Sequence, residues 1–141
     1  MGGLLACHWL LHQPAHPLTG LVLSSPFLGV AMKVNPVKLM FGYALSRLIL
    51  GVSLPFEMRI DDVCRDPDIR IAIDRDPLNH RVVNVRWFTE ALTAMALLQE
   101  RASEFTLPTL LLYAQNDRIV DAVETRCLLG KAPASSWRAL S

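Results

Sequence analysis

Residues 107–121 read Leu-Pro-Thr-Leu-Leu-Leu-Tyr-Ala-Gln-Asn-Asp-Arg-Ile-Val-Asp, and they carry the clearest structural pattern in the chain. Residues 109–113 within them are dominated by three consecutive leucines, as in a strand that is buried on both faces of a parallel sheet. A polar loop over residues 115–118 follows at once. Asp121 then stands where an N-cap would begin another helix. The stretch therefore predicts a buried strand, a polar corner and a helix start in direct succession.

The first part of the chain repeats this kind of alternation. Residues 2–13 predict a helix that is apolar on nearly every side, which is typical of a buried helix. Residues 21–25 form a second continuous apolar run, which Pro26 ends. The best helical periodicity covers residues 82–103. Because buried strands alternate with helices, the sequence indicates an α/β fold with a parallel sheet.

The C-terminal part continues the pattern. After Asp121 we expect a helix over residues 122–129, closed by Gly130 in the C′ position. Residues 137–140 read as the beginning of another strand. Residues 27–81 are too long for a plain crossover between a strand and a helix, so they predict a helical cap that passes over one edge of the sheet. Three pairs within this cap are helix-start or turn signals: Asn35-Pro36, Asp66-Pro67 and Asp76-Pro77.

Composition excludes several classes of protein. The chain has 141 residues, of which 52% are hydrophobic and 19% charged, which fits one globular domain and not a disordered segment. The net charge is +1, with no basic stripe that alternates with aromatics, so we expect no nucleic-acid partner. The spacing of Cys7, Cys64 and Cys127 matches no zinc or redox motif, and their odd number argues against a disulfide framework. We therefore expect a reducing location, which for this chain means the cytoplasm.

The cap is basic and apolar in its first half. Up to Phe56, its lysines and arginines are Lys33, Lys38 and Arg47, and the first acidic residue is Glu57. Such a segment can contact an anionic lipid surface, which would make the protein membrane-associated through the cap; alternatively, it is a local fluctuation in a buried region. Its apolar side chains suit an acyl chain or simply pack on the sheet. They are Phe27, Leu28, Met40, Phe41, Leu45, Leu48 and Leu54.

Two places carry candidate chemistry. Ligands of open parallel sheets bind beyond the carboxyl ends of the strands, and Asp117 lies just after residues 109–113. A carboxylate there can orient a catalytic histidine, or it can cap the turn or pair with Arg118. Met1-Gly2-Gly3 opens the first helix with the small residues that a sharp strand-to-helix turn requires. The alternative is an ordinary start methionine followed by a flexible glycine pair.

In order and spacing, four segments resemble the α/β-hydrolase family, and specifically its monoacylglycerol lipases and lysophospholipases. Met1-Gly2-Gly3 resembles the end of the nucleophile elbow, which in this branch commonly reads Gly-His-Ser-Met-Gly-Gly. Residues 21–26 are similar to the strand after the elbow helix, and Asp76-Pro77-Leu78 to the end of the cap. Residues 107–121 resemble the acid strand and its loop. The resemblance covers essentially the whole chain.

This resemblance implies a partial α/β-hydrolase domain with three parts: an elbow helix and strand over residues 1–26, a cap over 27–81, and the long helix, acid strand and last helix over 82–141. It implies that Asp117 is the triad acid and that the Met1 backbone N–H belongs to the oxyanion hole. It also suggests substrate contacts for four cap residues, namely Phe27, Leu28, Phe41 and Leu45. No organic cofactor or metal is implied.

The resemblance is incomplete at the triad. No serine precedes Met1 and no histidine follows Asp117, although the triad order in this fold is Ser, Asp, His. We therefore expect a fragment that begins just after the nucleophile and is inactive as this chain alone. The implied parent is a serine hydrolase that cleaves acyl esters of lysophospholipids or monoacylglycerols. Alternatives are an esterase or aminopeptidase of the same fold, or a non-catalytic fragment that binds lipid or protein.

Other polar residues are less suited to chemistry. His8 and His12 have the i, i+4 spacing of a zinc pair, but no carboxylate accompanies them, so core or helix-end histidines are expected. Ser25 ends a strand but lacks the Gly-x-Ser-x-Gly context of a nucleophile. The arginines and aspartates of residues 57–81 alternate and predict a solvated ion-pair surface.

Overall fold

A computed structural model describes residues 1–31, 40–44, 51–55, 60–79, 81–133 and 137–140. The chain divides into two compact units, one formed by Met1–Ala31 with Leu92–Ser141 and the other by Met32–Ala91. Within the described ranges, no helix combines the length and the apolar character that crossing a membrane requires.

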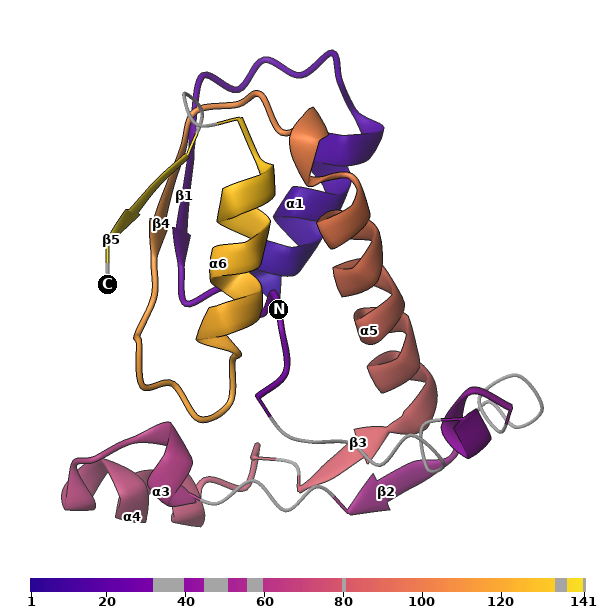
Figure 1. The fold of residues 1–141 in the computed structure, drawn as a ribbon. Coiled ribbons are helices and arrows are strands. Elements are labelled where there is room, and N and C mark those ends of the chain that lie inside the picture. The colour runs from indigo at the N-terminus through magenta and orange to yellow at the C-terminus, as the bar shows by residue number, and fades with distance from the viewer. Residues whose placement is uncertain (32–39, 45–50, 56–59, 80, 134–136, 141) are drawn as a thin grey trace. The chain divides into compact units, whose positions relative to one another are not determined.

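The first unit is built on a parallel sheet of three strands (Figure 1). These are β1 (Leu21–Ser24), β4 (Thr109–Leu112) and β5 (Trp137–Leu140), in the order β1-β4-β5. Both neighbouring pairs run parallel. The predicted α/β class and the predicted third strand are thus confirmed.

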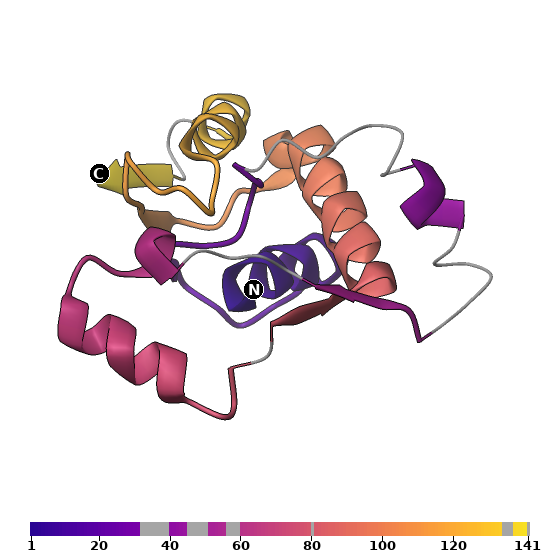
Figure 2. The same ribbon diagram turned by 90° about the horizontal axis from the view of Figure 1, so that it is seen from below.

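Helices cover one face of this sheet. Figure 2 shows α1 (Gly2–His12) and α6 (Ala122–Lys131) on the same side, with α1 nearer β1 and α6 nearer β5. A short 3-10 helix, η1 (Ala102–Glu104), precedes β4. The core of this unit is apolar, and its least exposed members are Leu4, Cys7, Leu23, Leu28, Leu98, Ala102, Phe105, Leu111 and Leu128.

Three expectations about this unit are wrong in detail. Residues 21–25 were expected to be buried on both faces, but Val22 is 66% exposed, because no helix covers its side of the sheet within the described chain. The first helix was expected to be buried on nearly every side, but its Leu5 and Trp9 side chains are exposed. Gly130 does not end the last helix: α6 continues to Lys131 and is capped by Ala132 with φ −73°.

The long helix begins later than its periodicity predicts. α5 runs from Val85 to Glu100, and Val82–Asn84 instead form a strand, β3. This strand pairs antiparallel with β2 (Ser53–Pro55). Val82 and Val83 have a high strand propensity, and pairing with the distant residues 53–55 makes them a strand where the helical periodicity predicts a helix. The Asn84 side chain then accepts the amides of Arg86 and Trp87 at 2.9 and 3.2 Å and starts the helix.

The rest of the second unit follows its start signals. Two short helices, α3 (Ile60–Val63) and α4 (Pro67–Arg75), lie in sequence, and residues 40–44 are also helical. As predicted, Asp66 caps α4 by accepting the Asp68 amide at 2.9 Å. Asp76 forms a turn, and its carboxylate accepts the Leu78 amide at 2.9 Å. The signal at Asn35-Pro36 lies outside the described residues.

An ion pair of the expected surface kind is present in this unit. Arg70 and Asp61 approach to 2.8 Å, and both side chains are partly exposed. Pairs of this kind contribute at most about 1 kcal/mol. The charged segment therefore adds solubility more than stability.

Close packing at Gly3 gives a first testable prediction. A Cβ at Gly3 would lie 2.5 Å from the Pro26 Cβ, whereas a Cβ at Gly2 would meet nothing within 4 Å. We expect Gly3→Ala to lower the free energy of unfolding by about 1–3 kcal/mol. The matched control Gly2→Ala should leave it unchanged or raise it by up to about 1 kcal/mol. Urea unfolding of both variants measures the difference, and equal stabilities would contradict the packing.

Candidate active site

The carboxyl ends of the three strands meet at one edge of the first unit. The Ser25 amide donates to the Leu112 carbonyl at 2.8 Å, and the Tyr113 amide donates to Leu140 at 3.1 Å. Ser25 has φ 42°, in the left-handed region, so the chain turns sharply where β1 ends. The residues that follow β1 and β4 are thereby placed beside each other, as expected for the ligand-binding edge of a parallel sheet.

The beginning of α1 lies at this same edge. The close approach of Gly3 to Pro26, the second residue after β1, places Met1 near the end of that strand (Figure 1). The Met1 carbonyl accepts the Leu5 amide at 3.2 Å and so belongs to the first turn of the helix. The start of the chain and the loop after β4 thus belong to one edge of one sheet.

The Asp117 side chain is held in place by backbone amides of the loop after β4. One carboxylate oxygen, Oδ1, accepts the amides of Ile119 and Val120 at 2.8 and 2.9 Å, and the side chain is half-buried. The expectation that this acid can cap the turn is therefore confirmed. Within the described chain, Oδ2 makes no hydrogen bond. The geometry fixes the carboxylate while leaving one oxygen for another group.

Residues 29–31 pair in a strand-like manner with residues 119–121 of the loop that carries Asp117. The Ala31 amide donates to Ile119 at 3.1 Å, and the Asp121 amide donates to Gly29 at 3.2 Å. Val30 and Val120 form an antiparallel bridge between these two bonds. The segment after β1 therefore holds the loop that carries the acid.

Gly29 makes this contact possible, and it is a positioning residue that the sequence did not reveal. A Cβ at Gly29 would lie 2.5 Å from the Glu124 Cβ and 3.2 Å from the Asp121 Cβ. Any larger residue would push α6 and the loop away. A glycine shortly after a strand was a visible signal, but its partner lies more than 90 residues away in sequence.

Asp121 has the structural role that the sequence predicts. Its Oδ1 accepts the amides of Val123 and Glu124 at 2.7 and 3.3 Å, which caps α6. The Thr125 hydroxyl also donates to the Asp121 carbonyl at 2.9 Å. Asp121 is therefore committed to the helix, and Asp117 is the better candidate for a catalytic acid.

The candidate substrate contacts are divided among several environments. Leu28 is 2% exposed and belongs to the core of the first unit, and Phe27 beside it is half-buried. Phe41 belongs to the second unit and is 65% exposed. Leu45 lies outside the described residues.

His8 and His12 pack against each other on α1. The rings of His8 and His12 stack with centroids 4.5 Å apart, and His12 Nδ1 lies 2.8 Å from the His8 carbonyl. In the described part of the chain, no three His, Cys, Asp or Glu side chains gather closely enough to hold a metal ion. The pair therefore has the helix-end role that the sequence favours.

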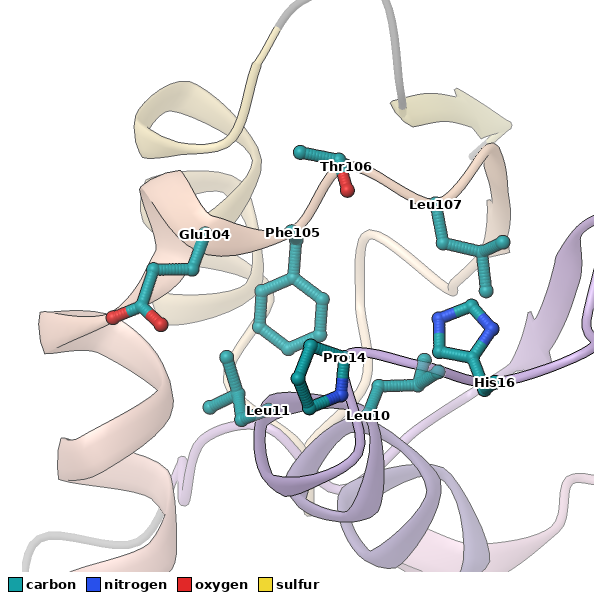
Figure 3. A pocket seen from close by; sticks show the side chains of 8 residues that line it. All are labelled: Leu10, Leu11, Pro14, His16, Glu104, Phe105, Thr106 and Leu107. Carbon is teal, nitrogen blue, oxygen red and sulfur yellow. The ribbon is translucent and has the colours of Figure 1, made fainter.

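A pocket of about 110 Å³ lies away from the Asp117 edge (Figure 3). It is formed where α1 ends and the chain approaches β4, and its lining residues are Leu10, Leu11, Pro14, His16, Glu104, Phe105, Thr106 and Leu107. Hydrogen bonds from Arg101 hold the pKa of the Glu104 carboxyl below its usual range, so this acid stays ionised and paired. Because neither Asp117 nor any other residue of its loop lines this pocket, the pocket is distinct from the candidate catalytic edge.

Cys7 is an unsuitable nucleophile. Burial raises the pKa of its thiol to about 12, so it stays protonated at neutral pH. Cys127, in contrast, is exposed on α6. We expect a thiol reagent at pH 8 to modify Cys127 rapidly and Cys7 only on unfolding, as peptide mass mapping of the labelled chain would show. Equal rates at the two sites would contradict the burial of Cys7.

Comparison with known proteins adds family information to this geometry. A family model described as "Serine aminopeptidase, S33" matches residues 1–139. Phospholipase YtpA of Bacillus subtilis (strain 168) is 33% identical over 122 residues, which are 86% of this chain and 47% of that protein. The monoacylglycerol lipase of Mycolicibacterium smegmatis is 26% identical over 132 residues, covering 93% of this chain and 46% of the lipase.

Solved structures share the fold. The monoacylglycerol lipase of Paleococcus ferrophilus has a TM-score of 0.87 at 23% identity, over 98% of this chain and 53% of that one. A soluble variant of the monoglyceride lipase of Saccharomyces cerevisiae has a TM-score of 0.77 at 15% identity, over 95% and 48%. The chain thus spans about half the length of each of these relatives.

Proposed function

Because the chain belongs to the serine aminopeptidase S33 family of α/β-hydrolases, we propose that it supplies the acid-bearing part of a serine hydrolase acting on monoacylglycerols or lysophospholipids. The observation that carries this proposal is the Asp117 carboxylate. Two backbone amides hold its Oδ1 at the carboxyl edge of the sheet, and Oδ2 makes no hydrogen bond within the described chain. An acid fixed in this manner can orient an imidazole without losing its own position.

In the proposed reaction, a serine attacks the ester carbonyl while a histidine takes its proton and later passes it to the leaving alcohol. Asp117 accepts the other N–H of that histidine, selects its tautomer and stabilises the imidazolium that forms. The serine and the histidine come from polypeptide outside these 141 residues. A backbone N–H at Met1, when the chain continues upstream of it, would face the oxyanion.

Two observations support a lipid ester as the substrate. The relatives named above are a phospholipase and monoacylglycerol lipases. The second unit also exposes large apolar side chains, Met40 and Phe41, which suit an acyl chain. We propose the lipid surface itself as the site from which the substrate is taken, with the cap making a peripheral contact.

The 141 residues alone are predicted to be inactive. They contain neither a Gly-x-Ser-x-Gly motif nor a histidine after Asp117, so two of the three triad groups are not supplied. Without them we expect no hydrolysis of a monoacylglycerol above background and no labelling by a fluorophosphonate probe. Stoichiometric labelling of the purified 141-residue chain would contradict this prediction.

A chimaera tests the function itself. In it, this chain replaces the matching segment of phospholipase YtpA, so that YtpA supplies polypeptide on both sides. We expect the folded chimaera to hydrolyse a monoacylglycerol and a lysophospholipid and to react with the fluorophosphonate. A chimaera that shows native circular dichroism but cleaves neither lipid would defeat the proposal. Preferred cleavage of an aminoacyl anilide would replace the lipid assignment by an aminopeptidase.

A further inference from the structure

We propose that residues 29–31 are positioning residues for Asp117, and that they couple this acid to the connection between the two units. The second unit begins directly after Ala31. The residues that lead out of the first unit therefore also hold the loop of the acid, and the carboxylate follows them when they shift. The inference rests on the proposed function, because it concerns the acid of that reaction.

Ile119 is shared between the acid and this connection. Its amide donates to Oδ1 of Asp117 at 2.8 Å, and its carbonyl accepts the Ala31 amide at 3.1 Å. The Val120 amide adds a second bond to Oδ1 at 2.9 Å. In Figure 1 the segment after β1 accordingly runs beside the loop between β4 and α6. A shift of Ala31 is thus passed to the carboxylate through a single residue.

The contact between the segment and the loop has a fixed register. The Asp121 amide donates to the Gly29 carbonyl at 3.2 Å, and Val30 and Val120 form the antiparallel bridge beside this bond. Hydrogen bonds on both sides of a bridge set the separation of two antiparallel segments and keep them from sliding past each other. Residues 29–31 and the loop therefore move together.

The segment is anchored in the first unit on its other side. Leu28 is 2% exposed in the core, and its amide donates to the Pro26 carbonyl at 2.9 Å. The Ser25 amide is bonded to Leu112 at the end of β4. Along the chain, residues 29–31 thus lie between a buried anchor and the start of the second unit.

Small displacements of the acid have large effects on a reaction of this kind. A carboxylate that orients a histidine must stay within hydrogen-bond distance of it, and a misplacement of about 1 Å costs up to about 100-fold in rate. The close approach at Gly29 makes such a displacement easy to produce. A Cβ there would lie 2.5 and 3.1 Å from Cβ and Cγ of Glu124. A larger residue must therefore separate the segment from the loop.

An exchange of side-chain size tests the coupling in the YtpA chimaera. Gly29→Ala should lower kcat for a monoacylglycerol by about 10–100-fold and leave KM nearly unchanged, because the acid does not touch the substrate. Glu124→Gly removes both atoms that the new Cβ would meet most closely. Because Glu124 is exposed, this change alone should keep kcat within about twofold of the parent.

The combined variant Gly29→Ala/Glu124→Gly should recover most of the lost turnover. Circular dichroism and urea unfolding show which variants are folded. A folded Gly29→Ala variant with the parent kcat would overturn the proposal. So would a folded combined variant as slow as Gly29→Ala, since the loss would then not arise from this contact.

A double-mutant cycle tests whether the effect passes through Asp117. In the Asp117→Asn background the charge that the histidine needs is already absent, so Gly29→Ala should change kcat by no more than about twofold. A general distortion of the fold would instead multiply the two losses. The same fractional loss in both backgrounds would therefore contradict the coupling.

Hydrogen exchange in the 141-residue chain distinguishes this proposal from the proposed function. We expect Gly29→Ala to speed exchange of the Ile119 and Val120 amides by about tenfold or more, because the loop opens more often. The amide of Leu111, at the centre of β4, is the internal control and should not change. Ala31→Pro removes the donor to Ile119 without filling the space at position 29, and it should have the same effect.

The two failures have different signatures. A parent chimaera that cleaves neither lipid defeats the proposed function, and the exchange rates then still decide the coupling. Unchanged exchange at Ile119 and Val120 in both folded variants would overturn it. Faster exchange at these two amides, with Leu111 unchanged, would support it even in an inactive protein.

Discussion

Replacing Asp117 by asparagine in the YtpA chimaera is expected to lower kcat for a monoacylglycerol by about 10⁴-fold. The substitution preserves Oδ1, which accepts the amides of Ile119 and Val120, so the loop should keep its shape. It removes the negative charge and presents an amide donor to the histidine, which then favours the wrong tautomer. KM should change little because the acid does not touch the substrate. Steady-state kinetics together with circular dichroism measure both effects.

Asp121→Asn is the matched control for this prediction. Asp121 is the second acid of the same loop, but its carboxylate caps α6, and asparagine caps a helix about as well. Its kcat should therefore stay within about twofold of the parent chimaera. A large loss at Asp121 with normal turnover at Asp117 would exchange the two roles and contradict the site.

Leu111→Ala is expected to lower the free energy of unfolding of the 141-residue chain by about 2–5 kcal/mol. Leu111 is 0% exposed at the centre of β4, with β1 on one side and β5 on the other. Truncating it removes buried apolar surface and leaves a cavity that the surrounding strands cannot close. Such a loss is a large fraction of the stability of an ordinary domain. Urea unfolding followed by circular dichroism measures it.

Leu5→Ala provides the comparison for the core prediction. Leu5 is the same residue type in the same unit but is 64% exposed, and alanine is favoured in a helix. We expect its effect on the free energy of unfolding to stay within about 0.5 kcal/mol. If the two leucine truncations cost the same, β4 is not the centre of the core.

Local patterns were sufficient to predict much of this fold. The apolar runs at residues 21–25 and 109–113 identified two strands of the parallel sheet, because strands in such sheets carry few polar residues. Asp121 was identified as an N-cap because a short acid before a helical segment satisfies its first amides. These signals lie within a few residues of the structure that they determine.

The errors arose where distant segments meet. Val82 fits the helical spacing, but residues 82–84 pair with residues 53–55, which local periodicity does not report. Val22 looked like a buried residue because its neighbours are apolar, whereas its exposure depends on which layers the chain contains. The role of Gly29 was not predicted because its close neighbour is Glu124, in a helix near the other end of the chain.

At the candidate site, too, local features could be predicted from the sequence and contacts between distant segments could not. The position of Asp117 after a buried strand was readable from the sequence, since carboxyl ends of parallel strands gather ligand-binding residues. The amides that hold it, and the bridge between Val30 and Val120 that fixes its loop, depend on the fold. Its catalytic role stays a prediction.

A crystal structure of the chimaera with a fluorophosphonate bound to its serine is the most direct test. It should place Oδ2 of Asp117 within about 2.6–3.2 Å of one ring nitrogen of a histidine, with the other nitrogen facing the modified serine. Oδ1 should still accept the Ile119 and Val120 amides. A different carboxylate in contact with that histidine, with Asp117 turned away from it, would contradict the proposed role of this chain.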